Sequence, residues 1–348
     1  MTEPQKRDGG GPVGGIAALS GRWSGLGPLA RLKYQEYALG IVVVLIFVVG
    51  SILEPDSFPT SDNIRNMLTQ ASVVGVIAMG MTFVIATGGI DLSVGSVLAA
   101  AGMAGAVLVD PSGTTALFMA GTIGFAALLG TISATAVAFG RVAPFIATLA
   151  MFSVARGLAL LLNDKLPVNL LELNGGNFGD PAVGSLMWFG TGEILGIPIS
   201  VFIFAAVTIG AWLLLNRSRY GRHVVAVGGN REAARIAGVP VRKIVFSVYV
   251  ISAVLAGIAA ILLCARLGSA SPVSGNLYEL DAIGAVVIGG TSLAGGRATI
   301  VGTFLGVLTF ALIFSLMTQL NLSTEVQQVT KGAIVLGAVL LQRPEAKL

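Results

Sequence analysis

The sequence predicts an all-α fold: a polytopic transmembrane helical bundle of about ten spans, with both the N- and the C-terminus cytoplasmic. Hydrophobic residues make up 55% of the chain and charged residues only 11%, whereas a soluble domain carries about 25% charge. The 47 glycines also fit a membrane protein, because small residues let transmembrane helices pack closely. The distribution of Lys and Arg along the chain gives the orientation.

Ten apolar runs form the predicted spans. A helix needs about 20 mainly apolar residues to cross a bilayer, and Pro and Gly mark the breaks between the runs. The eighth run is too short to cross alone, so it is expected either to be a half-helix or to extend back into 277–279. The predicted spans are 37–53, 64–88, 92–109, 114–140, 145–162, 197–215, 244–265, 280–290, 298–320 and 325–342.

The charge distribution tests this ten-span arrangement. With the N-terminus inside, sixteen of the 21 Lys and Arg fall in inside segments, and most acids fall outside or at the outer edges of spans. Nine or eleven spans would spoil this agreement with the positive-inside rule. We therefore expect a cytoplasmic tail at 1–36, a transmembrane domain at 37–342 and a cytoplasmic C-terminus at 343–348.

The N-terminal tail is glycine-rich and basic, and it has no continuous apolar core. We expect it to be disordered and not to be a cleavable signal peptide. The single cysteine, Cys264, lies in an apolar run, where a small buried side chain is expected. The net charge of +4 is attributed to inside loops that attract anionic lipid, so no nucleic-acid partner is expected.

The largest outside segment, 163–196, contains Trp188 and several acids. One interpretation is a loop with an aromatic anchor at the membrane interface. The other is part of an outer mouth, or the contact for an external binding protein. The sequence does not separate the two.

Catalytic and cofactor motifs are missing from the sequence. There is one histidine, His223, and no cluster of Cys or His for a metal. The stretch Gly290–Arg297 has the glycines of a phosphate-binding loop but lacks the Lys–Ser/Thr that should follow them, so it is interpreted as a tight turn. We expect no enzyme activity, no metal and no cofactor, and we expect ATP to be split elsewhere than in this chain.

A compact polar turn follows the second predicted span, with the sequence Gly-Gly-Ile-Asp-Leu-Ser at 88–93. Glycine suits the end of one helix and Asp91 the N-cap of the next. An ionisable group at the inside end of a pathway also fits a gate or a coupling point, and both interpretations stay open. The pathway and gate candidates are Thr82, Thr87, Gly88, Gly89, Asp91 and Ser93.

The segment 289–296 matches 88–95 at four of eight positions, a weak sign of an internal repeat.

Other polar residues lie within the apolar runs. Because a charge in a span is costly, Arg156 is expected to pair inside the bundle or to face polar surroundings, and Lys331 is expected either to snorkel or to pair. Hydroxyls and amides within the spans could line a route for a neutral polar solute, although Ser and Thr more often hydrogen-bond between helices. These residues are Thr82, Thr87, Ser93, Thr148, Ser153, Thr309, Gln319 and Gln327.

The segment 216–243 is a basic loop with seven Lys and Arg between the sixth and seventh spans. Within it, Asn230 is a good N-cap, 231–237 are strong helix formers and Gly238 suits the residue after the helix. We predict a two-turn helix beneath the membrane that leads into span seven. A positive anchor touching only lipid headgroups is the alternative to a docking element for another protein, and we favour docking.

Three motifs resemble those of the ribose/xylose/arabinose-type ABC transporter permeases. They are GMTFVIATGGIDLSVGS at 80–96, GRH with GGNREAARIAGV within 221–239, and GAVVIGGTSLAGG at 284–296. The similarity runs from about residue 40 to residue 342. Glu232–Ala233–Ala234 with Gly238 also resembles the start of the EAA loop of importer permeases, without the later Ile and Leu–Pro of that loop.

The resemblance implies a homodimeric permease of the bacterial inner membrane that imports a monosaccharide or a small neutral polyol by alternating access. Two ABC ATP-binding subunits would sit at the cytoplasmic face, and a periplasmic sugar-binding protein would deliver the solute at the other face. The predicted short helix would be the coupling helix. Its expected contact residues are Asn230, Arg231, Glu232, Ala233, Ala234, Arg235 and Gly238.

Three alternatives stay open. A branched-chain amino-acid ABC permease is the alternative within the class. A self-contained, ion-coupled secondary transporter should place carboxylates near mid-membrane, and our assignment of Asp91 to an inside helix end, with no acid in any span centre, argues against it. A structural or scaffold membrane protein is disfavoured by the many hydroxyls within the spans.

Overall fold

The computed structural model describes residues 28–109, 114–171 and 181–341. Most of the predicted tail, the C-terminus at 343–348 and the middle of the outside segment 163–196 lie outside the described residues. Within them the chain is an all-α bundle. Its helices are α2 (Pro28–Leu53), α3 (Ser61–Ala86), α4 (Val94–Leu108), α5 (Thr115–Ala138), α6 (Pro144–Leu161), α7 (Pro181–Thr191), α8 (Ile199–Trp212) continued by the π-helix η1 (Leu213–Arg217), α9 (Arg219–Gly229), α10 (Arg231–Ile236), α11 (Val241–Leu267), α12 (Tyr278–Ile288), α13 (Ile300–Gln319) and α14 (Thr324–Leu341).

Strands are confined, in the part of the chain that the structure describes, to two antiparallel pairs of two residues each. β1 (Val168–Asn169) pairs with β4 (Ser269–Ala270), and β2 (Glu193–Ile194) pairs with β3 (Ile197–Pro198). The first pair ties the segment after α6 to the segment after α11. Both pairs lie in the regions predicted to face outside.

Seven of the described helices are long and apolar enough to cross a membrane: α2, α3, α5, α6, α8 with η1, α11 and α13. The predicted third and eighth spans correspond to shorter helices, because α4 has 15 residues and α12 only 11. The tenth corresponds to α14, whose first half is polar. A helix therefore occupies each predicted span. The eighth extends back to Tyr278, as one alternative expected, but with 11 residues it remains a half-helix.

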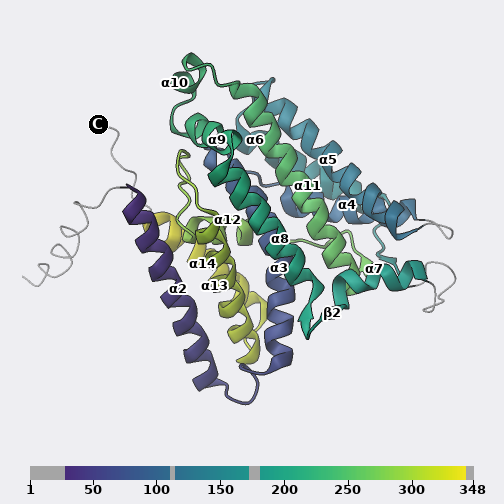
Figure 1. The fold of residues 1–348 in the computed structure, drawn as a ribbon. Helices are drawn as coiled ribbons and strands as arrows, with labels where there is room; N and C mark the ends of the chain where they lie inside the picture. The colour runs from purple at the N-terminus through teal and green to yellow at the C-terminus, as the bar shows by residue number, and fades with distance from the viewer. Residues whose placement is uncertain (1–27, 110–113, 172–180, 342–348) are drawn as a thin grey trace, which may run out of the picture.

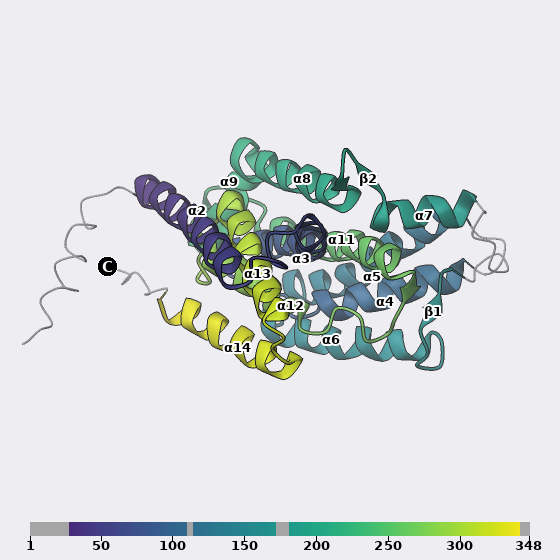
Figure 2. The same cartoon turned by 90° about the horizontal axis from the view of Figure 1, so that it is seen from below.

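The helices α3 and α11 form the centre of the bundle, whereas α2 lies at its edge (Figures 1 and 2). Small residues let the central helices approach closely. A Cβ on Gly80 of α3 would lie 2.9 Å from the Cα of Ser252 in α11, and one on Gly257 would lie 2.9 Å from the Cβ of Ala126 in α5. The glycine content thus serves close helix packing, as expected from the composition. Cys264 is buried in α11, as predicted.

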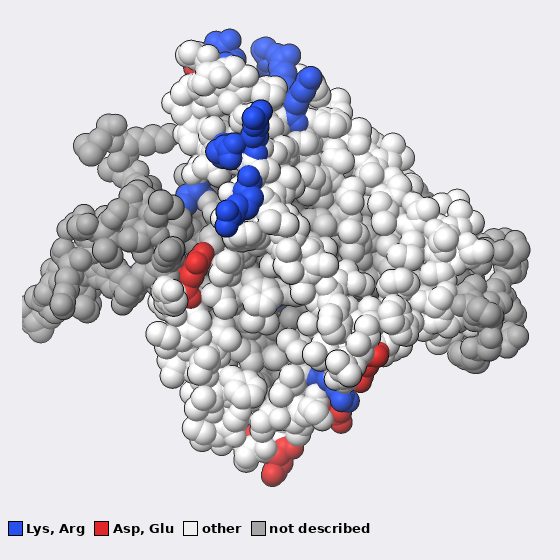
Figure 3. All heavy atoms as spheres, viewed as in Figure 1, with Lys and Arg blue, Asp and Glu red and all other residues white. Residues whose placement is uncertain are grey.

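Charges separate along the bundle axis. Lys and Arg gather at the end where α9 and α10 lie, and acids appear at the opposite end (Figure 3). Arg65, near the start of α3, contacts the β2–β3 hairpin at that opposite end through the backbone oxygen of Gly196, at 3.1 Å. The two ends of the bundle therefore differ in charge as the positive-inside rule requires of inside and outside faces.

Candidate functional site

The short helix predicted in the basic loop is present as α10. The side-chain oxygen of Asn230 accepts hydrogen bonds from the backbone N–H groups of Glu232 and Ala233, both at 3.0 Å. At the other end Gly238 has φ +80°, and its N–H donates to the carbonyl of Arg235. The predicted caps are therefore confirmed, and the helix ends at Ile236, one residue earlier than predicted.

The outer surface of α10 combines a charge pair with an apolar side chain. Arg235 donates to both carboxylate oxygens of Glu232, and both side chains are exposed. The hydrogen bond from Arg235 lowers the pKa of Glu232. Ile236 is 76% exposed, a feature that sequence reasoning did not single out. Ala234, one of the predicted contact residues, is only 4% exposed and faces the rest of the chain.

Three glycine pairs meet behind α10, at Gly88–Gly89, Gly228–Gly229 and Gly295–Gly296. The N–H of Gly296 donates to the carbonyl of Ala86 at 3.0 Å. A Cβ on Gly295 would lie 2.7 Å from the backbone nitrogen of Gly88, and one on Gly228 would overlap the carbonyl oxygen of Ala86. We call this contact the glycine junction. It joins the end of α3, the end of α9 and the turn after α12, and at Gly228, Gly295 and Gly296 the backbones approach too closely for a side chain.

The first residue of α10 reaches the same place. The guanidinium of Arg231 donates to the carbonyl of Thr87 over 3.5 Å, which is a weak hydrogen bond. The turns 88–95 and 289–296, compared above as a possible repeat, lie against each other in the junction. The short helix is thus connected to the polar turn both through Arg231 and through the end of α9.

Asp91 does not take the place predicted for it. Ser93 is the N-cap of α4, and Asp91 instead accepts hydrogen bonds from the backbone and the hydroxyl of Ser93, at 3.0 and 2.6 Å. Its second carboxylate oxygen accepts from the hydroxyl of Ser252 at 3.0 Å. The prediction of Asp91 as an N-cap was wrong, because a local turn and a partner on α11 use its oxygens.

The depth of Asp91 was also predicted wrongly. Ser252 follows Val241, the first residue of α11, by eleven positions, which is about 17 Å along a helix. Asp91 is 2% exposed, so it lies beside the middle of a 27-residue helix and not at an inside surface. Our residue-based argument against a secondary transporter, that no acid lies deep in the bundle, therefore fails.

Most of the predicted route-lining hydroxyls are used inside the bundle. The Thr82 and Thr303 hydroxyls lie 2.9 Å apart and link α3 to α13. Thr87 donates to the carbonyl of Val84, and Thr148 donates to that of Ile90 in the polar turn. All four of these threonines are buried. They bond between helices or to backbone, which is the commoner role of Thr in such bundles.

Arg156 and Lys331 both have partners. Arg156 donates to the carbonyls of Pro272 and Ser274, in the irregular segment before α12. The ammonium nitrogen of Lys331 lies 2.7 and 2.8 Å from the two carboxylate oxygens of Asp281 on α12, with both side chains largely buried. Of the two alternatives for Lys331, the structure shows pairing, and Asp281 is a second buried acid beside Asp91.

The comparisons with known proteins all match transport permeases, although the family model is described for amino acids and the relatives are named for sugars. A family model described as "Branched-chain amino acid transport system / permease component" matches residues 63–339. Ribose import permease protein RbsC of Escherichia coli (strain K12) is 42% identical over 308 residues, which cover 88% of this chain and 93% of that protein. RbsC of Bacillus subtilis (strain 168) is 43% identical over 312 residues, covering 88% and 92%.

A third relative, L-arabinose transport system permease protein AraH of Escherichia coli (strain K12), is 33% identical over 314 residues, covering 90% of this chain and 92% of that protein. The chain belongs to the monosaccharide ABC transporter permease family. It is a multi-pass membrane protein, and the relatives named here are transport permeases. No solved structure matches it.

One feature of this permease was missed in the sequence. Asn63, Asn66 and Gln70 follow one another at spacings of three and four residues on α3, so they share a face of an otherwise apolar helix. All three line a groove against α13 and α14, together with Gln319 and Gln327, which were among the predicted route-lining residues. The polar stripe on α3 was the signal that would have found this groove.

Proposed function

We propose that this chain is the membrane subunit of an ATP-driven importer for a monosaccharide or a similar small neutral polyol in the bacterial inner membrane. The relatives named for ribose and arabinose transport support the solute class. Partner subunits would bind and hydrolyse ATP at the face that carries α10. A periplasmic sugar-binding protein would deliver the solute at the opposite face, and two copies of the permease would form the translocation unit.

The single observation that carries the coupling role is the link from α10 to the glycine junction. An exposed helix with an ordered charge pair and an apolar tip at Ile236 offers a surface for a partner subunit. Movement of α10 would pass through Arg231 and Gly228 to the turn between α3 and α4. From there Asp91 and Ser252 would carry it to α11. Because the backbones at the glycine junction are in direct contact, a displacement of α9 and α10 should also displace the turn after α3.

We also propose ten spans with both termini cytoplasmic. Glu36, near the start of α2, accepts a hydrogen bond from Thr299, which follows the turn that contributes to the glycine junction. The N-terminal end of α2 therefore lies toward the α9–α10 end of the bundle. The segment 1–36 would be a cytoplasmic tail, 216–243 the coupling loop and 343–348 a cytoplasmic end. The outside segment 163–196 would contact the binding protein.

Reversal of charge on α10 tests the coupling role. Arg231→Glu together with Arg235→Glu should abolish co-purification of the ATP-binding subunit and reduce uptake at least about tenfold, because the contact loses its charge complementarity. Arg222→Glu, an exposed Arg on the neighbouring helix α9, is the matched control. Unchanged assembly together with unchanged transport in the double variant would contradict the coupling role of α10.

A further inference from the structure

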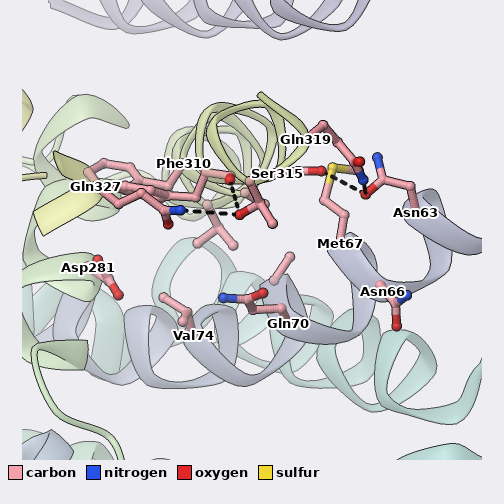
Figure 4. A pocket seen from close by; sticks show the side chains of 15 residues that line it. Asn63, Asn66, Met67, Gln70, Val74, Asp281, Phe310, Ser315, Gln319 and Gln327 are labelled. Atoms are coloured by element: carbon pink, nitrogen blue, oxygen red, sulfur yellow. Dashed lines mark hydrogen bonds between the residues drawn. The ribbon is translucent and has the colours of Figure 1, made fainter. Parts of the chain in front are cut away.

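A groove of about 250 Å³ opens between α3, α13 and α14 (Figure 4). Its walls carry amides and hydroxyls from α3, α13 and α14, and the rings of Phe310 and Phe314. Asp281 lies at one end of it and Asn63 at the other. The volume lies just below the about 300–1,000 Å³ of pockets that hold drug-sized ligands, so the groove suits a smaller molecule.

The amides of Asn66 and Gln70 face this groove without a protein partner. Both side chains are exposed, and neither makes a hydrogen bond to any of the described residues, whereas Asn63 accepts from Ser315 and Gln319, at 3.0 and 2.9 Å. Gln70 lies nine residues after Ser61, the start of α3, or about 13 Å along the helix. A bare amide at that depth is costly in lipid, so the groove must hold water or a polar ligand.

The lining selects a neutral, hydroxyl-rich ligand. Each amide offers donors and an acceptor, which match the mixed donor and acceptor character of a hydroxyl. Phe310 and Phe314 provide apolar faces for the C–H surface of such a molecule. Among the described residues that line the groove, Asp281 is the only charged one, and its ion pair with Lys331 neutralises it. An ionic ligand would find no unpaired opposite charge here.

The position of the groove also fits transport. It begins near Asn63, in the first turn of α3 at the end opposite to α10, and reaches inward to Asp281 in the first turn of the half-helix α12. A discontinuous helix at mid-depth is a common builder of solute sites in transporters. We propose that this groove is the outward-facing sugar site of the permease, with the amides of Asn66 and Gln70 bound to sugar hydroxyls. The proposal rests on the proposed function.

Uptake into proteoliposomes tests the site. The permease would be assembled with its ATP-binding subunit and its binding protein, and offered D-ribose, D-allose and L-arabinose. Asn66→Leu and Gln70→Leu should each lower the rate of uptake about tenfold or more, because a sugar hydroxyl loses its partner. Co-purification with the ATP-binding subunit should not change. Gln328→Leu, an exposed amide next to Gln327 that does not line the groove, is the matched control.

A second measurement does not depend on transport by a leucine variant. Asn66→Cys should react with a membrane-impermeant thiol reagent added from outside, because the side chain at this position is exposed. The native Cys264 is buried, so it should contribute little background labelling. Millimolar amounts of the transported sugar should slow that reaction several-fold at Asn66→Cys and leave it unchanged at Gln328→Cys. Equal labelling with and without the sugar at Asn66→Cys would overturn the proposal.

The outcomes separate this site from the proposed function. A wild-type complex that carries none of the three sugars overturns the proposed function and the sugar site with it. A wild-type complex that carries a sugar, beside leucine variants that carry it equally well, overturns the groove alone. Loss of uptake in the leucine variants, with normal assembly and with normal uptake by the Gln328→Leu control, supports the site.

Discussion

At the scale of single residues, Arg156 stabilises an irregular segment inside the bundle. The chain between β4 and α12 is not helical, so no helical backbone N–H groups pair with the carbonyls of Pro272 and Ser274. In a bilayer such groups must be satisfied within the protein. The guanidinium of Arg156 donates to two of them, on Pro272 and Ser274. The costly charge and the irregular backbone therefore compensate each other.

Lys331 and Asp281 are two further charges within the bundle, and each needs a partner to offset the cost of its burial. They lie 2.7 Å apart in a largely buried contact, and the Lys331 ammonium also lies 5.1 Å from the centroid of the Phe314 ring. Removal of one partner leaves the other charge buried and unpaired, which costs about 3–5 kcal/mol. Replacement of both by neutral side chains removes that penalty.

A double-mutant cycle tests this account. Asp281→Asn and Lys331→Met should each lower the thermal stability of the detergent-solubilised permease strongly, whereas the double variant should be more stable than either single variant. Apparent melting temperatures of the four proteins provide the measurement. Single effects that simply add in the double variant would mean that the pair does not interact.

At the scale of elements, the glycine junction connects three segments distant in sequence. Gly228 and Gly229 are neighbours at the end of α9, yet their surroundings differ. A Cβ on Gly228 would collide with the carbonyl of Ala86, whereas one on Gly229 would come only within 4.0 Å of the Cα of Gly296. This difference gives a matched pair of substitutions.

Gly228→Ala should separate α9 from α3 and reduce sugar uptake by the reconstituted complex about tenfold or more, because a backbone contact cannot adjust to a methyl group as a flexible side chain can. Gly229→Ala should retain uptake close to that of the wild type. Uptake and stimulation of ATP hydrolysis by the binding protein would be measured on both variants. Equal behaviour of the two would contradict the role of the junction.

The elements differ in how far the sequence predicts them. The helix α10 was predictable because Asn230 and Gly238 are local capping signals. The surroundings of Asp91 were not, because Ser252 lies 161 residues away and only tertiary packing brings it near. The same holds for the glycine junction: its motifs were visible in the sequence, but their contact was not. The groove was predictable in part. The polar stripe of Asn63, Asn66 and Gln70 on α3 is visible in the local sequence, but the contact of this stripe with α13 and α14 depends on tertiary packing.

At the scale of the whole molecule, the chain places its polar groups in three layers. Basic residues and α10 lie at one end, and Arg65 with the β2–β3 hairpin lies at the other. Between them, Asp91 and the Asp281–Lys331 pair lie within the bundle. Buried acids are also a feature of ion-coupled transporters, so the residues alone do not decide the energy source. Family membership is what favours ATP.

Energy coupling is therefore the most direct test of the central claim. Sugar uptake would be measured in proteoliposomes that contain the permease with and without its ATP-binding subunit, in the presence and absence of ATP and of a protonophore. We predict uptake that requires both the ATP-binding subunit and ATP and that persists with the protonophore. Uptake that continues without the ATP-binding subunit and collapses with the protonophore would contradict the account.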